Sequence, residues 1–188
     1  MRKTILSTIM MIAGVTFFYF ASRAQTSSHT LTLTDIRTQM VADWERAKAY
    51  TVDYLNTMPA DKYNYKPNDS VRTFAGHMLH LAMVNLVFLA TAIDVTPLPW
   101  AQIARQNSPT AQNKDSVMYY VTTSYDFVIN AIKTSDVSKW GETVKVMGFE
   151  ATRFALLNKI FEHQTHHRGQ TTIYIRMQNI RPPNERLF

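Results

Sequence analysis

Cysteine is absent from the 188-residue sequence. Its absence excludes disulfide bonds, nucleophilic cysteine chemistry and thiolate metal sites, so a metal ion would be held only by imidazole, carboxylate or other oxygen ligands. Glycine is also scarce, with 5 residues, whereas methionine is plentiful, with 10. Few glycines and many long, flexible apolar side chains are typical of a helical protein with a packed core.

Beyond the first 24 residues, charge of one sign is not concentrated in any part of the chain. The formal net charge is +6, but three of the basic residues, Arg2, Lys3 and Arg23, lie in the first 24 residues. The other basic residues are scattered among acidic ones, and no module that reads a nucleic-acid groove is visible. We therefore expect no nucleic-acid partner.

The first 24 residues have the layout of a secretory signal peptide. A short positive start precedes the almost wholly apolar residues 5–21, and Ser22 and Ala24 are the small residues of a cleavage site. An uncleaved membrane anchor is the alternative, because about 17 apolar residues is the lower limit for crossing a bilayer. We expect cleavage, which leaves residues 25–188 as one domain, exported to the periplasm or secreted, without a stable membrane partner.

Apolar residues at intervals of three or four predict four helices. The expected helices span residues 32–58, 71–93, 114–134 and 149–179 or 149–180. Thr32 or Thr34 is the expected N-cap of the first helix, and Ser70 that of the second. Residues 143–146 fit an extended segment, but no credible strand pair or internal repeat is visible. The expected fold is all-α, most simply an antiparallel four-helix bundle with one or more longer connections.

The longest connection runs from Asp94 to Asn113 and contains Trp100. A loop of this length either crosses a bundle or covers a pocket. Trp100 is therefore either part of a lid or packed over the end of the bundle.

Five of the six histidines fall in two short windows of the predicted helices, and the sixth lies in a polar N-terminal lead. The windows contain His77 and His80, and then His163, His166 and His167; the sixth histidine is His29. Because positions i and i+4 of a helix are neighbours, His163 and His167 project side by side and can hold one ion. Residues in line with this pair are largely apolar, whereas those in line with His166 are charged, so His166 is expected to face outward.

A third ligand is expected from the other window. His80 is the predicted ligand and His77 the alternative, because only one of the two needs to reach the bundle axis. Three histidines leave a coordination position open, as in catalytic rather than structural sites. The competing interpretation is that these are ordinary core histidines, since the spacing His-x-x-x-His also occurs by chance.

The same residues carry a family resemblance. The segment from His163 to Gln170, continuing to Pro182 and Pro183, resembles the last helix of the DinB-like superfamily of bacterial four-helix-bundle proteins. Upstream, Val71-Arg-Thr-Phe74 followed by His80 looks like that family's second helix, and the connector Tyr63-Asn-Tyr-Lys-Pro67 is also similar. Asn179 stands where glycine commonly ends the last helix, and asparagine tolerates the same left-handed conformation.

This resemblance implies an up-down bundle with a three-histidine site for zinc, nickel or a similar divalent ion, often in a homodimer. Carried over by position, the ligands fall on His80, His163 and His167. Some members are thiol-dependent transferases that use cytosolic thiols, and others are called metal-dependent hydrolases. An exported protein would seldom meet cytosolic thiols, which disfavours the transferase.

A divalent ion on three neutral imidazoles lowers the pKa of a bound water. The simplest expected function is therefore metal-dependent hydrolysis of a small ester or amide whose identity the sequence leaves open. The alternatives are a non-catalytic, stress-associated metal-binding bundle and a thiol-dependent transferase. No carboxylate stands out as a proton shuttle, and Glu162 lies on a line that faces away from the ligands.

Five further residues are candidates to support the ligands or line the pocket: His77, Asn85, Arg168, Gln170 and Tyr174. Asn85 and Tyr174 would alternatively be hydrogen-bonded core residues. Arg168 would alternatively form a surface or interface ion pair.

Overall fold

The structure is a computed structural model that describes residues 30–99 and 108–188. Four long helices dominate the described residues: α1 (Leu33–Thr57), α2 (Phe74–Ile93), α3 (Lys114–Thr134) and α4 (Arg153–Arg176). Short 3-10 turns lie between them: η1 (Ala60–Lys62), η4 (Pro109–Ala111) and η5 (Val137–Lys139). The predicted signal peptide, His29 and Trp100 lie outside the described residues.

Each long helix begins at a side-chain oxygen that accepts a hydrogen bond from the backbone of the first turn. These N-caps are Thr32, Thr73, Asn113 and Thr152. The cap at Thr32 is one of the two predicted for α1. For α2 the predicted cap was wrong, because Ser70 bonds back to Asn68, and Thr73 takes its place three residues later. The helix starts therefore follow the local preference of threonine and asparagine for capping positions.

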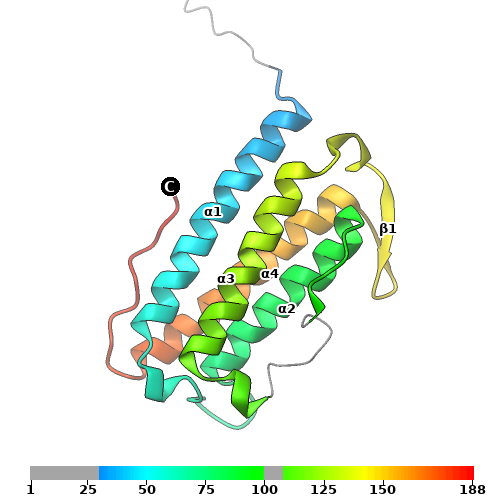
Figure 1. Cartoon of the computed structure of the whole chain (residues 1–188). Coiled ribbons are helices and arrows are strands. Elements are labelled where there is room, and N and C mark those ends of the chain that lie inside the picture. The colour runs from blue at the N-terminus through cyan, green and yellow to red at the C-terminus, as the bar shows by residue number, and fades with distance from the viewer. Residues whose placement is uncertain (1–29, 100–107) are drawn as a thin grey trace, which may run out of the picture. The chain divides into compact units, whose positions relative to one another are not determined.

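Contacts between helix ends give the directions of the helices. The cap residue Thr73 of α2 bonds to Gln112 just before α3, so α2 and α3 start at the same end of the bundle. Tyr54 near the end of α1 bonds to Thr172 near the end of α4, so these two helices also run together. Figure 1 shows the result, in which α2 and α3 run opposite to α1 and α4.

This order differs from the simple antiparallel sequence of helices that we predicted. The connection between α2 and α3 spans residues 94–113, which is long enough to return the chain to the opposite end of a 20-residue helix. The expected longer crossing is therefore present, and it makes two neighbouring helices parallel. The helical class of the fold is confirmed.

Helix α2 is the central element of the core. It packs against both α3 and α4, and most of its side chains are buried. Among the described helices, α2 is long and apolar enough to cross a membrane, but the core helix of a bundle has the same composition. Beside it, the buried ring of Trp44 makes edge-on contacts with Tyr125 and Phe161, which join α1 to α3 and α4.

A two-stranded hairpin precedes α4. Strand β1 (Thr143–Val146) pairs antiparallel with β2 (Phe149–Thr152). The extended segment predicted at residues 143–146 is confirmed, but the absence of a strand pair and the start of the last helix at Phe149 were wrong. Met147 and Gly148 form the turn with positive φ values of 50° and 86°, the backbone of a two-residue hairpin turn.

The last helix also ends earlier than predicted, at Arg176 rather than at residue 179 or 180. Asn179 has φ 59°, so it adopts the left-handed conformation expected of it. The residues between Arg176 and Asn179 form tighter turns, with Gln178 N bonding to Ile175 O.

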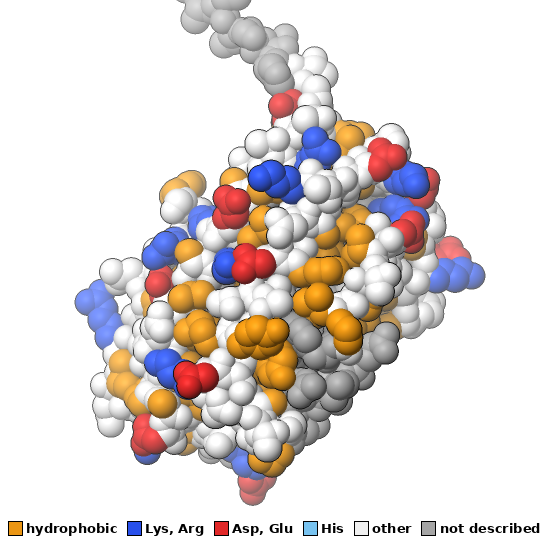
Figure 2. Space-filling model, viewed as in Figure 1, with side chains coloured by type: hydrophobic (Ala, Val, Ile, Leu, Met, Phe, Trp, Pro, Cys, Tyr) orange, Lys and Arg blue, Asp and Glu red, His pale blue; other side chains and the backbone are white. Residues whose placement is uncertain are grey.

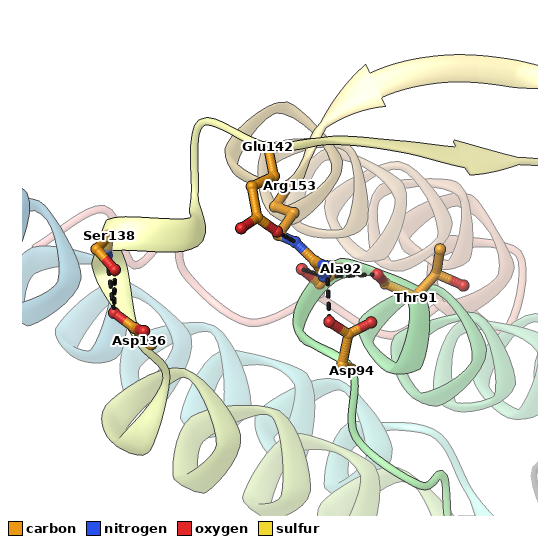
Figure 3. Close-up of polar contacts among 7 residues, drawn as sticks. All are labelled: Thr91, Ala92, Asp94, Asp136, Ser138, Glu142 and Arg153. Atoms are coloured by element: carbon orange, nitrogen blue, oxygen red, sulfur yellow. Dashed lines mark hydrogen bonds and ion pairs between the residues drawn. The ribbon is translucent and has the colours of Figure 1, made fainter.

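Arg153 ties the start of α4 to the end of α2 (Figure 3). Its buried guanidinium donates to the carbonyl of Ala92 at 3.1 Å and to Asp94 at 2.6 Å. It also donates to Glu142, next to the hairpin, at 3.0 Å. Because α4 runs back along α2 from this point, Arg153 helps to set the register that brings their histidines together.

Candidate metal centre

Three histidines from the two antiparallel helices α2 and α4 converge in the bundle. His80 comes from α2, and His163 and His167 lie one turn apart on α4. One ring nitrogen of each lies within 4.8 Å of the others. The ring centroids are 4.4 Å apart for His163 and His167 and 4.8 Å apart for His80 and His167. These three residues, hereafter the histidine trio, could hold a metal ion.

No histidine side chain is visible among the described residues on the face shown in Figure 2, where acidic and basic side chains are interspersed with hydrophobic ones. The absence of a single-sign field on this face agrees with the scattered charges of the sequence.

Burial keeps His77, His163 and His167 neutral at physiological pH. It lowers the pKa of His163 to about 4 and that of His167 to about 3, and nearby histidines add to both effects. It also lowers the pKa of His77 to about 4, where Arg72 contributes further. A neutral imidazole is the form that binds a metal ion, so these rings are in the binding state near pH 7.

A chain of hydrogen bonds behind His167 fixes its tautomer. The hydroxyl of Tyr174 donates to the carbonyl of Arg72 at 2.8 Å, because a carbonyl can only accept. The same oxygen lies 3.0 Å from Nε2 of His77 and must accept that N–H. Neutral His77 has no second ring proton, so its Nδ1, at 2.9 Å, accepts the N–H of Nδ1 in His167. Neutral His167 is left with a free lone pair on Nε2.

This arrangement gives His77 and His80 different places. His80 is a member of the histidine trio, and His77 lies behind His167 and holds its ring. A partner on the second nitrogen is the usual feature of a metal-binding histidine. Tyr174 is the last side chain in this series of hydrogen bonds and so supports His167 through His77. A supporting role was one of those considered for it from the sequence.

The residues present fit a divalent ion. Nδ1 of His163 is buried and has no hydrogen-bond partner among the described residues, although an unpaired buried polar atom is costly. Three imidazoles also match the ligands that zinc and nickel accept. Nitrogens in a tetrahedral zinc site are about 3.4 Å apart, and those of the trio lie within 4.8 Å of one another. Rotation of the rings within their rotamers would shorten these distances.

The other candidates for supporting residues lie in different surroundings. Asn85 is buried and donates to Ser124 on α3 at 3.4 Å. Arg168 is buried against α1, donates to Gln164 at 2.8 Å and lies over the ring of Tyr50. Arg168 is buried and forms no ion pair among the described residues, so the surface ion pair predicted as its alternative is absent there. Both side chains contribute to packing between helices.

Two residues of α4 face solvent as the helical pattern predicted. His166 is exposed and accepts a hydrogen bond from Gln170. Glu162 is exposed and pairs with Lys159 at 2.8 Å, and this hydrogen bond lowers the pKa of Glu162. Glu162 is therefore a surface residue away from the trio.

Two features of the site were missed from the sequence. One is Arg72, noted only within the family motif, which lies beside His77 in a polar recess. The other is an apolar recess between α2 and the hairpin, which has His80 and His163 in its lining. The pair Met147-Gly148 between two short apolar alternations was the signal that could have revealed the hairpin and hence this recess.

We expect the metal-free protein to lose stability as the pH falls from about 6.5 to about 4. Below 6.5 the histidines of the unfolded chain take up protons, whereas His77 and His163 in the folded protein remain neutral down to about 4. The unfolded state is therefore favoured progressively across this window. Thermal unfolding followed by circular dichroism from pH 7 to pH 4 measures the effect, and a constant melting temperature would contradict it.

We expect Tyr174→Phe to weaken zinc binding about 10-fold, the lower part of the range for residues that support metal ligands. The change removes the acceptor of the His77 N–H and frees the tautomer of both rings. Titration against a competing chelator measures the affinity. Tyr65→Phe is the matched control, because the Tyr65 ring packs on Tyr174 while its hydroxyl donates to Met177 Sδ, away from His77. Equal affinities of both variants would contradict the role of the Tyr174 hydroxyl.

Known proteins share this architecture. A DinB-like protein from Bacillus cereus has a TM-score of 0.64 and 14% sequence identity, covering 79% of this chain and 96% of that chain. A DinB-like protein from Bacillus subtilis has a TM-score of 0.57 and 20% identity, covering 80% of this chain and 96% of that chain. At these identities the likeness concerns the fold alone.

The sequence comparison is more specific. Among curated proteins, none matches the chain. The sequence profile of the DinB family, however, matches residues 27–184, which include all four helices and the histidine trio. Because this match extends over most of the sequence, the chain belongs to the DinB family.

Proposed function

We propose that this protein binds one divalent ion, zinc or nickel, through His80, His163 and His167 and hydrolyses a small ester or amide there. The observation that carries the proposal is the convergence of three histidines at the edge of an apolar recess, with His77 bonded to the second ring nitrogen of His167. A divalent ion in such a site polarises a carbonyl and makes water a better nucleophile at neutral pH.

The residues around the trio support a catalytic rather than a closed site. The hydrogen bonds from Tyr174 through His77 to Nδ1 of His167 leave the lone pair of His167 on Nε2, the other ring nitrogen. Three protein ligands leave room for a further ligand, which a structural site with four protein ligands does not. The recess beside His80 and His163 gives a small molecule access to this position.

A non-catalytic metal site is the second candidate. The trio joins α2 to α4, so an ion bound there would cross-link two helices and stabilise the fold. The two functions differ in what metal removal does. Loss of stability without any metal-dependent turnover would favour the structural role.

The test compares metal-free, zinc-loaded and nickel-loaded protein on a panel of nitrophenyl esters and nitroanilides. We expect turnover that disappears with the metal and returns when it is added back. The matched variants are His80→Gln, which removes a ligand, and His166→Gln, which changes an exposed ring outside the trio. Turnover in the metal-free protein, or equal turnover in both variants, would contradict the proposal.

A further inference from the structure

Two recesses with different chemistry border on the histidines of α2. The polar recess has a volume of about 470 Å³ and is lined by Ser70, Val71, Arg72, His77 and Gln170. The apolar recess has a volume of about 790 Å³ and extends from His80 and His163 along α2 to Thr91. His77 lines one recess, and His80 and His163 line the other, so each recess borders on this histidine cluster.

The apolar recess has two walls. One is a face of α2 with Met83, Val84, Val87 and Phe88, and the other is the hairpin around Val146 and Met147. Val87 is 38% exposed and Met147 is 80% exposed, so apolar surface at this recess is open to solvent. From His80 to Val87 the helix rises by about 10 Å, which is the length of a medium acyl chain.

The polar recess carries the positive charge that is available to a ligand. Arg72 is exposed and makes no ion pair among the described residues. By contrast, Lys145, the cation at the apolar recess, is paired with Glu150 at 3.2 Å. An anionic group is therefore attracted to the Arg72 end, where the Gln170 amide has a second N–H besides the one bonded to His166.

Arg72 is connected to the trio through His77. The two residues line the same recess, and Nδ1 of His77 lies 2.9 Å from Nδ1 of His167. A ligand that bound Arg72 through an anion would consequently lie next to the histidines.

We propose that the substrate is an amphipathic acyl compound, an N-acyl amino acid or the matching ester, with its carboxylate at Arg72 and its acyl chain in the apolar recess. This assignment rests on the proposed hydrolytic function. In such a molecule the carbonyl lies between head group and chain, and the histidines of α2 that border the two recesses, His77 and His80, are one helical turn apart. Hydrolysis adds one water across the acyl bond and releases a fatty acid and an amino acid or hydroxy acid.

The test measures binding without turnover. The probes are ketone isosteres, in which a methylene replaces the amide nitrogen, of N-octanoylglycine, N-acetylglycine and the neutral N-octanoylglycinamide. Calorimetry with the zinc-loaded protein should give the tightest binding for the octanoyl carboxylate. We expect a loss of at least about 10-fold on shortening the chain and a similar loss on neutralising the head group.

Paired variants assign each part of the ligand to its recess. Arg72→Gln should weaken binding of the anionic probe about 10-fold and leave the neutral probe unchanged. Val87→Gln should weaken the octanoyl probes but not the acetyl probe. Arg176→Gln and Ile173→Gln are matched controls at exposed positions of α4 outside both recesses.

The outcomes separate this inference from the proposed hydrolysis. Equal affinity for the three probes, or equal effects of Arg72→Gln on charged and neutral probes, would overturn the substrate class even where simple esters are hydrolysed. The expected binding pattern without any turnover of N-octanoylglycine or its ester would support a ligand site of this chemistry and overturn the reaction.

Discussion

His163→Ala is expected to remove stoichiometric zinc from the protein, whereas His166→Ala should retain it. The two histidines are three residues apart on α4, but only His163 belongs to the trio, and His166 is exposed and bonded to Gln170. Loss of a supporting residue alone weakens metal binding 10- to 100-fold, so loss of a ligand should weaken it by at least about 100-fold. Elemental analysis and chelator competition measure the difference.

The His163→Ala variant should still fold. Nδ1 of His163 is buried without a partner among the described residues, so its removal leaves no broken hydrogen bond at that atom. Metal-free His163→Ala and His166→Ala should therefore have similar helical content by circular dichroism. Full zinc occupancy in folded His163→Ala protein would remove the basis of the metal site.

Arg153→Met is expected to destabilise the protein by about 2 kcal/mol, which corresponds to a fall in melting temperature of about 4–8 °C at this chain length. The change keeps an apolar stem but removes the donors to the carbonyls of Thr91 and Ala92 at the end of α2 (Figure 3). Asp94 and Glu142 have side chains 66% and 52% exposed, so water would solvate them after the change. The expected loss is therefore smaller than for a fully buried ion pair.

The control for Arg153→Met is Lys159→Met on the same helix. Lys159 also forms an ion pair, with Glu162, but both side chains are about two thirds or more exposed. Surface pairs of this kind contribute little, so the control should change stability by no more than about 0.5 kcal/mol. Chemical denaturation of the metal-free proteins makes the comparison. A similar loss in both variants would show that the buried contacts of Arg153 do not hold α2 and α4 together.

Arg153 also links stability to the metal site. It holds the first turn of α4 against the last turn of α2, and the trio depends on the register between these two helices. A change at Arg153 should therefore reduce zinc affinity without touching a ligand. Chelator-competition titrations of zinc binding to Arg153→Met and Lys159→Met would reveal this coupling.

Local sequence preferences were sufficient for most of the helical fold. The apolar period of α3 gave its limits at Lys114 and Thr134, and Thr32 began α1 as expected. The spacing of His163 and His167 placed both on one face of α4, because that relation depends only on helix geometry. His166 and Glu162 faced solvent for the same reason.

The sequence determined features that depend on residues close together in the chain: the helices, the pairing of His163 with His167 and the resemblance to one family. Tertiary structure decided the parallel course of α2 and α3, the two recesses and the different places of His77 and His80. These two residues are three apart on one helix, and only the packing of α4 places one in the trio and the other behind His167. Such choices depend on contacts between residues about 90 positions apart, which periodicity along a single helix does not encode.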